Sequence, residues 1–352
     1  MARIAIAGAG LAGRLMAWAL LRAGHEVLLA DPAPGPEPAF DGHGAAAFSA
    51  AGMLSPLAEQ ECGGEAVARL GWRSLALWPR IVDRLSAAPR FAALGSLLLA
   101  HPGDRGAAQR ALARMPGAQP LAREALSALE PALAAHRGLL AWQLPGEGLI
   151  DTVATLAALH RDSGAARWLW GQEVLEVGPG RLRLRDGRGL EADWAVDTRG
   201  LGGRPQLPLR GVRGETVWLD LPSHGLRRPL RLLHPRHRVY LVPRDERRLI
   251  VGATEIESED RSEASLKSAV ELMSAAHSLL PALAEARILR LDRNLRPALP
   301  DNLPHAHAEP GLLRLNGLYR HGWLLAPALV DQLLRQSGLA TLEDPHHADP
   351  TR

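Results

Sequence analysis

Three glycines near the start of the chain have the spacing of a phosphate-binding loop. Gly8, Gly10 and Gly13 stand in the stretch GAGLAG, which has the pattern GxGxxG. The first glycine of this pattern permits a tight turn, the second lets the backbone approach a pyrophosphate, and the third lets a helix pack closely on a strand. We therefore predict an adenine dinucleotide site here, and we include the intervening Leu11 and Ala12 in it.

The segments around this loop have the order that such a site requires. Residues 3–7 are an apolar run typical of a short buried strand, and residues 11–23 have a helical pattern that closes at Gly24. A second predicted strand, residues 25–31, ends in Asp31, whose carboxylate can accept hydrogen bonds from an adenosine ribose. An acid at this place disfavours the 2′-phosphate of NADP, but the loop itself does not distinguish NAD from FAD.

Length and composition exclude several other classes of protein. The 352 residues suit two joined domains, and 47% of them are hydrophobic. Cys62 is the only cysteine, which excludes an intramolecular disulfide and fits a reducing cytoplasm, so we expect a cytoplasmic protein. The net charge is only +3, and the chain has neither a long basic tract nor an apolar run of transmembrane length. We therefore expect neither nucleic acid nor a membrane as a partner.

The histidines do not form a metal-binding pattern. His234, His237, His305 and His307 come in two close pairs. No carboxylate–histidine spacing of a known metal site accompanies them, so we expect no metal ion.

The rest of the chain predicts an interrupted Rossmann-type domain. Residues 32–44 are a proline-rich loop, and residues 45–61 have no clear helical or strand period. Helical patterns cover 65–89, 106–137, the segment after Asp151, 263–285 and the last part of 311–338. Strand patterns cover 173–200, with a hairpin, and then 211–257. We predict an α/β protein whose second domain is α+β and is built on an antiparallel or mixed sheet.

Five segments of the chain, taken in order, resemble the D-amino-acid oxidase superfamily of flavoproteins, and most of all its glycine oxidase branch, which is associated with thiamine biosynthesis. The first is GAGLAG together with Asp31. The others are SAAGMLSPLAE at 49–59, VYLVPR with RLIVGAT at 239–254, NLRPALPDNLP at 294–304 and NGLYRHGWLLAP at 316–327.

The resemblance implies noncovalent FAD and a small amino-acid or amine substrate. The implied reaction is oxidative deamination of glycine or a similar amine by hydride transfer to flavin, with dioxygen reoxidising the flavin to give hydrogen peroxide. The product would be hydrolysed or would enter thiazole assembly for thiamine. We expect a discontinuous FAD-binding domain of residues 1–85, 146–208 and 290–352 and a substrate-binding domain of residues 86–145 and 209–289.

The resemblance also implies which residues act on the substrate. Hydride transfer requires a substrate held with its C–H toward the flavin and its amine neutral, so a carboxylate anchor is needed. Arginine suits this role because its planar guanidinium matches a carboxylate bidentately. Arg296 in the LRP stretch matches the family's anchor, Tyr240 matches a tyrosine that hydrogen-bonds the same carboxylate, and Arg320 matches a second arginine of the pocket.

Other residues correspond to the family's contacts with the cofactor. Ala51, Gly52 and Met53 match a segment whose backbone lies against the flavin ring, and Val174 matches a strand position whose backbone meets the adenine. Amides at the start of the last helix can stabilise negative charge on the flavin as it is reduced. The predicted contacts there are His321, Gly322, Trp323 and Leu324.

Several positions depart from the family pattern. TRG at 198–200 replaces a strand-end ATG or ASG, and Arg238 replaces a family histidine. Glu255 stands where glycine oxidases tend to place an apolar residue beside the substrate. If Glu255 faces the cavity, its carboxylate would favour a cationic or larger amine over glycine. The alternative is a strand-end acid in solvent, near Glu257 and Glu259.

Other functions fit the same residues. A related flavoprotein could oxidise a secondary, N-methylated or peptidyl amine, or a dehydrogenase could pass electrons to a carrier other than dioxygen. A flavin-binding accessory protein without turnover and a nicotinamide dehydrogenase are further alternatives. The sequence does not determine whether the protein forms a homo-oligomer.

Overall fold

The first strand of the chain lies at the centre of a mainly parallel sheet. The computed structural model describes residues 1–136, 138–233 and 238–343. As predicted, β1 (Arg3–Ala7) is buried, and it pairs in parallel with β2 (Glu26–Asp31) and with β13 (Trp194–Asp197). The strand order is β19-β20-β13-β1-β2-β9, in which β19 alone is antiparallel. The outer strands are β19 (His305–Glu309), β20 (Leu312–Asn316) and β9 (Arg167–Trp170).

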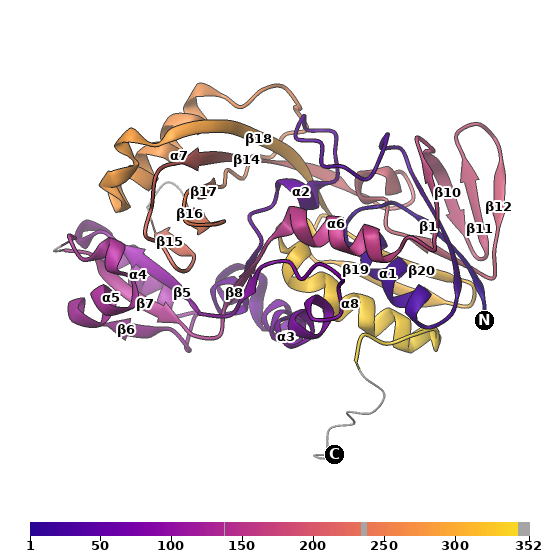
Figure 1. Ribbon diagram of the computed structural model, residues 1–352, viewed down its shortest axis with the longest axis horizontal. Coiled ribbons are helices and arrows are strands. Elements are labelled where there is room, and N and C mark those ends of the chain that lie inside the picture. Colours follow the sequence, from indigo (N-terminus) through magenta and orange to yellow (C-terminus); the bar gives the residue numbers. More distant parts are fainter. Residues whose placement is uncertain (137, 234–237, 344–352) are drawn as a thin grey trace, which may run out of the picture.

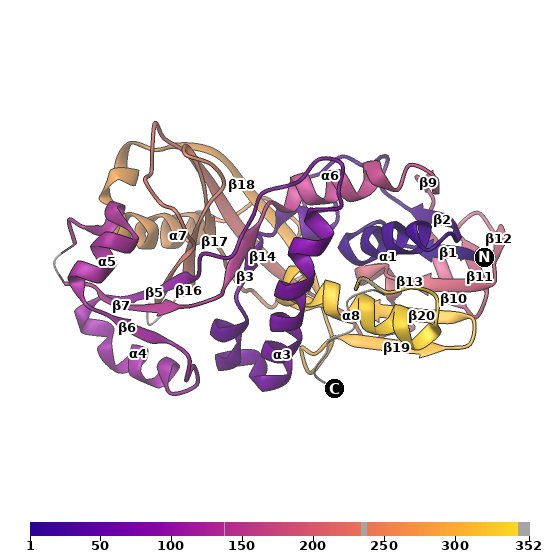
Figure 2. The same ribbon diagram turned by 60° about the horizontal axis from the view of Figure 1, so that its bottom comes forward.

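Helices cover one face of this sheet, and a small sheet covers the other (Figures 1 and 2). On the helical face, Ile6 and Leu313 belong to a core that they share with the helices α1 (Leu11–Arg22), α6 (Thr152–Asp162) and α8 (Gly322–Ser337). The opposite face carries small side chains such as Ala5 and Ala7, which allow close packing against a three-stranded sheet. That sheet consists of β10 (Val174–Gly178), β11 (Arg181–Leu184) and β12 (Gly189–Glu191).

An eight-stranded sheet forms the other half of the molecule (Figure 1). Its order is β18-β14-β17-β16-β15-β5-β7-β6, and it is mixed because β15 and β5 pair in parallel. The long pair of β14 and β18 extends from this sheet toward the parallel sheet (Figure 1). The strands are β18 (Arg287–Ala298), β14 (Arg210–Asp220), β17 (Arg248–Gly252), β16 (Arg238–Pro243), β15 (Leu230–Leu233), β5 (Ser96–Ala100), β7 (Leu140–Leu144) and β6 (Gln119–Leu121).

The two faces of this sheet have different neighbours. One face packs its Leu and Val side chains against α7 (Leu266–Leu279). On the other face, Trp218, Val242 and Ile250 pack with Ala51. This second face therefore meets the segment that the sequence assigns to the flavin.

The remaining elements connect the two halves. A small sheet has the order β3-β8-β4, with β3 (Met53–Leu54), β8 (Gly148–Ile150) and β4 (Phe91–Ala92).

Helix α6 begins directly after its predicted N-cap Asp151, whose side chain accepts a hydrogen bond from the Ala154 amide.

The helical pattern predicted over residues 106–137 is only partly right for the described residues of this segment. This segment contains α4 (Arg105–Leu112), the edge strand β6 and α5 (Arg123–Leu129). Proline explains the breaks, because it lacks a backbone donor and disfavours helix interiors. Pro120 lies in β6 itself, which is tolerated because β6 is an edge strand.

Two other boundaries differ from the sequence prediction. The helix predicted at 65–89 is α3 (Pro56–Val82), which begins earlier and has a non-helical residue at Gly64. The segment 45–61 shows no period because it contains three short pieces in succession: α2 (Ala46–Ser49), β3 and the first turns of α3. Strand β9 was not predicted.

Some predictions concern residues outside the described part of the chain, including those about His234 and His237. Among the described residues, no group of three or more His, Cys, Asp and Glu side chains could hold a metal ion. No helix in the same part of the chain is long and apolar enough to cross a membrane.

Candidate active site

A cavity of about 1660 Å³ joins the glycine-rich loop to the eight-stranded sheet. Asp31 lines one part of it, and Tyr240 and Arg296 line another. Every predicted site residue lines this cavity except Gly13 and Leu324. Residues that lie far apart in the sequence are therefore brought to one space large enough for a dinucleotide and a small substrate.

Glycine stands at each of the three positions of the first loop for a different structural reason. Gly8 has a φ of +101°, and a Cβ there would lie 2.5 Å from the Thr198 carbonyl oxygen. A Cβ on Gly13 would overlap with the Gly8 carbonyl, so Gly13 serves the packing of α1. A Cβ on Gly10 would meet only Ala45, at 4.0 Å. The protein therefore has room for a side chain at Gly10. Because Gly10 lines the cavity, this open space beside its backbone is suited to a pyrophosphate.

The start of α1 supports the same site. No side chain caps the helix at Gly10, and the first intrahelical bond is donated by the Arg14 amide to the Gly10 carbonyl. The backbone amides of Leu11 and Ala12 are at the cavity wall. Uncapped amides at a helix start attract an anion such as a phosphate.

Asp31 is held in position by the backbone around it. Its carboxylate oxygens accept hydrogen bonds from the Ala9 amide at 2.6 Å and from the Ala33 amide at 2.8 Å. Each oxygen retains a second acceptor site, and the carboxylate lines the cavity beside the glycine-rich loop. This arrangement fits the predicted ribose contact.

An arginine that departs from the family pattern fixes the strand predicted to meet the adenine. The Arg199 guanidinium donates to the carbonyls of Val174 at 3.0 Å and Leu175 at 2.8 Å. It also pairs with Asp197 at 2.8 Å, and both side chains are buried. Arg199 thus ties β10 to the end of β13 at this end of the cavity.

The segment of Ala51, Gly52 and Met53 lines the cavity. Gly52 has a φ of +71°, and a Cβ there would overlap with the Ile150 carbonyl. The buried guanidinium of Arg244 donates to the Ala51 carbonyl at 2.6 Å and to the Ile150 carbonyl at 2.9 Å. These bonds hold the segment in place from the eight-stranded sheet.

The start of α8 also reaches the cavity wall. His321, Gly322 and Trp323 line the cavity, and no side chain caps this helix end. The Trp323 indole donates to the Ala47 carbonyl at 3.0 Å, which ties α8 to α2. The Leu324 side chain is buried in the core, and Leu324 does not line the cavity.

Arg296 and Tyr240 lie over two glycines of neighbouring strands. Arg296 donates to the carbonyls of Arg213 at 3.4 Å and Thr254 at 3.1 Å. Its guanidinium has no carboxylate partner in the described part of the chain, and a Cβ on Gly214 would overlap with it.

A Cβ on Gly252 would lie 2.6 Å from the Tyr240 hydroxyl oxygen. Gly252 of β17 pairs with Thr216 of β14, two residues from Gly214, so the hydroxyl and the Arg296 guanidinium lie over these two adjacent strands from β16 and β18 on either side. Burial raises the pKa of the Tyr240 phenol, which keeps it protonated and able to donate. Together the two groups are suited to bind one carboxylate.

A charged cluster lies beside this anchor. Glu59 pairs with Arg320 at 2.6 Å and with Arg231 at 3.4 Å. Burial opposes ionisation of Glu59, but the charges of Arg320 and Arg231, together with that of His321 when it is protonated, outweigh it and lower the pKa of Glu59 to about 2. Burial lowers the pKa of His321, so this imidazole is neutral at neutral pH.

Glu255 also belongs to this cluster and lines the cavity. Its carboxylate pairs with Arg320 at 3.0 Å and accepts a hydrogen bond from Tyr319. Burial disfavours its charge, but the Tyr319 hydrogen bond and the Arg320 charge together lower its pKa. Glu255 thus lines the cavity in an ion pair, while 48% of its side chain is also exposed to solvent.

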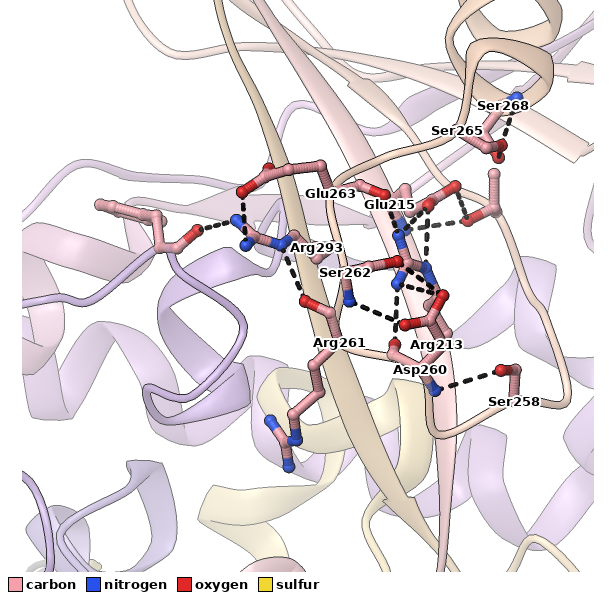
Figure 3. Close-up of polar contacts among 12 residues, drawn as sticks. Arg213, Glu215, Ser258, Asp260, Arg261, Ser262, Glu263, Ser265, Ser268 and Arg293 are labelled. Carbon is pink, nitrogen blue, oxygen red and sulfur yellow. Dashed lines mark hydrogen bonds and ion pairs between the residues drawn. The ribbon is translucent and has the colours of Figure 1, made fainter.

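A polar network behind the anchor fixes the loop that carries Thr254 and Glu255. Figure 3 shows Arg213 at its centre, paired with Glu215 at 2.6 Å. Arg213 also donates to the carbonyls of Asp260 at 2.7 Å and Glu263 at 2.8 Å. The Thr254 hydroxyl accepts from the Glu215 amide at 2.9 Å, so the carbonyl that receives Arg296 is held to β14.

Sequence reasoning missed several residues of this site. Glu59, Tyr319 and Gly252 lie inside segments that the motif analysis already quoted, and their spacing from predicted residues could have identified them. Arg244 likewise ends the quoted stretch VYLVPR. Arg231 lies outside the quoted segments and carries no such signal, because single arginines are not distinctive in a chain with this many of them.

The fold and the cavity are those of a dinucleotide-dependent oxidoreductase, and comparison with known proteins identifies the family. Residues 3–333 match the family described as FAD dependent oxidoreductase, to which this chain belongs. Its cofactor is therefore FAD, which the open backbone at Gly10 and the position of Asp31 fit. Resemblance to the D-amino-acid oxidase superfamily is confirmed.

Individual relatives and structures agree with this assignment. The chain is 40% identical over 342 residues, 95% of its length and 96% of the relative's, to a Rhizobium etli protein named as the thiamine biosynthesis oxidoreductase ThiO. It is similar to the crystal structure of glycine oxidase from Geobacillus kaustophilus, with a TM-score of 0.80, 25% identity and coverage of 96% and 94% of the two chains.

A third relative is longer than this chain. The bifunctional protein MnmC of Caulobacter sp., named for biosynthesis of tRNA 5-methylaminomethyl-2-thiouridine, is 31% identical over 94% of this chain. The match spans only 53% of MnmC, so the chain corresponds to about half of that protein.

Proposed function

We propose that this enzyme oxidises glycine, or a small amino acid like it, at its amine. Bound FAD would supply the acceptor for a hydride from the α-carbon and the route by which the electron pair reaches dioxygen, which would become hydrogen peroxide. The amino acid loses this hydride and one ammonium proton, and water hydrolyses the resulting iminium to an oxo acid and ammonium. The observation that carries the proposal is the Arg296 guanidinium, which lines the cavity of the glycine-rich loop and has no acidic partner among the described residues.

The residues around Arg296 support the binding of one small carboxylate. Arg296 and the protonated Tyr240 would bind it together, because both groups donate and lie over the adjacent strands β14 and β17. Arg320 already holds Glu59 and Glu255, so its contribution to the substrate would be electrostatic. Fixing the carboxylate also fixes the α-carbon, which is the main requirement for hydride transfer.

The proposed cofactor contacts follow from the cavity lining. The amides of Leu11 and Ala12 would hold the pyrophosphate, Asp31 the ribose and the Val174 backbone the adenine. The segment of Ala51 to Met53 would lie against one side of the ring. The uncapped start of α8, residues 321–324, would stabilise negative charge on it as it is reduced.

We also propose that two sets of segments divide these tasks. Residues 1–85, 146–208 and 290–352 would bind FAD, and residues 86–145 and 209–289 would bind the substrate. All strands of the six-stranded sheet fall within the first set. Strand β18 crosses the boundary at residue 290 and carries Arg296, so the anchor is part of the connection between the sets.

The relatives support glycine as the substrate. The Rhizobium etli relative is named for thiamine biosynthesis, and the Geobacillus kaustophilus structure is a glycine oxidase. The iminium would then be a building block for the thiazole of thiamine, and dioxygen the electron acceptor.

Anaerobic titration of the purified yellow protein with glycine, sarcosine and D-alanine tests this function. We expect glycine to bleach the flavin absorbance and air to restore it with release of hydrogen peroxide. A yellow protein that none of these amines bleaches, or a colourless protein that binds NADH, would contradict the proposal.

A further inference from the structure

Among the acidic side chains near Arg296, Glu255 is the most open to the substrate end of the cavity. We propose that Glu255 makes this site selective for substrates with a single carboxylate and excludes those that carry a second one. The inference deepens the proposed function and rests on it, because it concerns the charge class of the amino acid bound at Arg296.

The first support is the position of Glu255. It follows Thr254, whose carbonyl receives the Arg296 guanidinium at 3.1 Å, and it lines the cavity. Its side chain is 48% exposed, whereas that of Glu59 is 10% exposed. Arg320 and Tyr319 hold the carboxylate in place, so it remains near the anchor as a fixed negative charge.

The second support is the balance of charge at this end of the cavity. Among the residues that line the cavity here, Arg231, Arg296 and Arg320 carry three positive charges, and Glu59 and Glu255 carry two negative charges. His321 is neutral, and the nearby Arg238 and Glu61 pair with each other at 2.8 Å. Within this set of lining residues one positive charge is left for a ligand, and Arg296 is the arginine of the three that has no acidic partner.

This balance matches a ligand with one carboxylate. A second carboxylate would leave an uncompensated negative charge beside Glu255, and juxtaposed like charges are costly in a partly desolvated site. Without the Glu255 charge, two positive charges would be left, and the Arg320 guanidinium would lose one of its two acidic partners. The variant site would then suit a dicarboxylate.

The binding of acetate and malonate to the FAD-loaded protein tests this directly. The two probes differ by one carboxylate, neither is an amine, and their dissociation constants can be measured by titration calorimetry at neutral pH. The proteins to compare are the wild type, Glu255→Gln, Glu255→Asp and Glu257→Gln. Glu257 is the matched control, because it lies in the same loop, is 64% exposed and pairs with Arg210 outside the cavity lining.

We expect the wild type to bind acetate more tightly than malonate. In Glu255→Gln the ratio of the two constants should shift toward malonate by about tenfold or more. Glu255→Asp and Glu257→Gln should keep the wild-type ratio, which separates a charge effect from a general disturbance of the loop. A wild type without preference, or an unchanged ratio in Glu255→Gln, would overturn the inference.

Turnover measurements give a second and independent test of the selectivity. Sarcosine and iminodiacetate are secondary amines that differ by the same carboxylate, so their kcat/KM ratio should shift in the same direction in Glu255→Gln. The probe titration does not depend on turnover, so the two proposals fail separately. An unbleached flavin would contradict amine oxidation, whereas a constant acetate-to-malonate ratio would contradict only the role of Glu255.

Discussion

The Arg296 guanidinium is held by two backbone carbonyls and has no acidic partner among the described residues, so its charge is available to a ligand. Replacing it should therefore affect substrate binding far more than folding. In Arg296→Met we expect substrate binding to weaken by about 2–5 kcal/mol, because the substrate carboxylate loses its charged partner. Anaerobic titration with glycine measures this change.

A matched control for Arg296→Met is Arg185→Met, which changes an exposed arginine paired with Glu173 away from the anchor. That variant should bind glycine as the wild type does. Equal effects of the two substitutions, or unchanged glycine binding in Arg296→Met, would show that Arg296 is not the anchor.

The glycine beneath the anchor gives a second prediction at this scale. A Cβ on Gly214 would overlap with the Arg296 guanidinium, so Gly214→Ala should displace the anchor while leaving the FAD site intact. We expect the KM for glycine to rise about tenfold or more, with unchanged FAD content, since misplacement by ~1 Å can cost that much. Gly103→Ala is the control, because a Cβ at Gly103 would meet nothing within 4 Å. Equal KM values in the two variants would contradict this role of Gly214.

The sequence could indicate Arg296 and Tyr240 because both stand in motifs that the resemblance covers. It could not indicate how Arg320 is used, since its two acidic partners, Glu59 and Glu255, come from distant segments. It left two positions open for Glu255, because only the fold determines whether a residue after a strand faces solvent or a cavity.

At the scale of elements, β1, the glycine-rich loop and α1 form a unit in which different glycines serve folding and cofactor binding. Gly10 has space for a methyl group within the chain, whereas a methyl on Gly13 would overlap with the Gly8 carbonyl. Gly10→Ala should therefore reduce FAD affinity while changing the stability of the apoprotein by under about 1 kcal/mol. Gly13→Ala should lower the apoprotein's stability itself, by about 1–3 kcal/mol for an overpacked site.

Flavin fluorescence quenching gives the FAD dissociation constants for this comparison, and thermal unfolding of the apoprotein gives the stabilities. Gly13→Ala serves as the contrast to Gly10→Ala, because it has the same chemistry three residues away. An apoprotein destabilised equally by both changes would mean that Gly10 serves packing and not the cofactor.

This same unit was the part of the fold that the sequence predicted best. Its signals are local: an apolar strand, a glycine turn, a helical period and a second strand follow one another without interruption. The breaks at Pro120 and Pro131 within residues 106–137 were missed, because most residues of this segment favour a helix. Strand β9 pairs with β2, which lies far from it in the sequence, so no local sequence pattern predicts β9.

At the scale of the whole molecule, Glu59 connects the two halves. It belongs to α3, which packs on α8, and it pairs with Arg320 just before α8 and with Arg231 on the eight-stranded sheet. Its pKa of about 2 in the folded protein lies below its ordinary 4.5. The folded state therefore binds this proton more weakly than the unfolded state, and ionised Glu59 stabilises the fold above pH 4.5.

This stabilisation should be lost as the pH falls from 4.5 toward 2, and its size is roughly 3 kcal/mol. Thermal unfolding of the wild type and of Glu59→Gln from neutral to acid pH tests it. At neutral pH the variant should unfold at a lower temperature, and the two curves should converge as the medium becomes acid, because other carboxylates titrate alike in both. Glu257→Gln, which changes an exposed acid, should run parallel to the wild type throughout. If Glu59→Gln did the same, the carboxylate would not couple the halves, and the β14–β18 pair would have to connect them without its help.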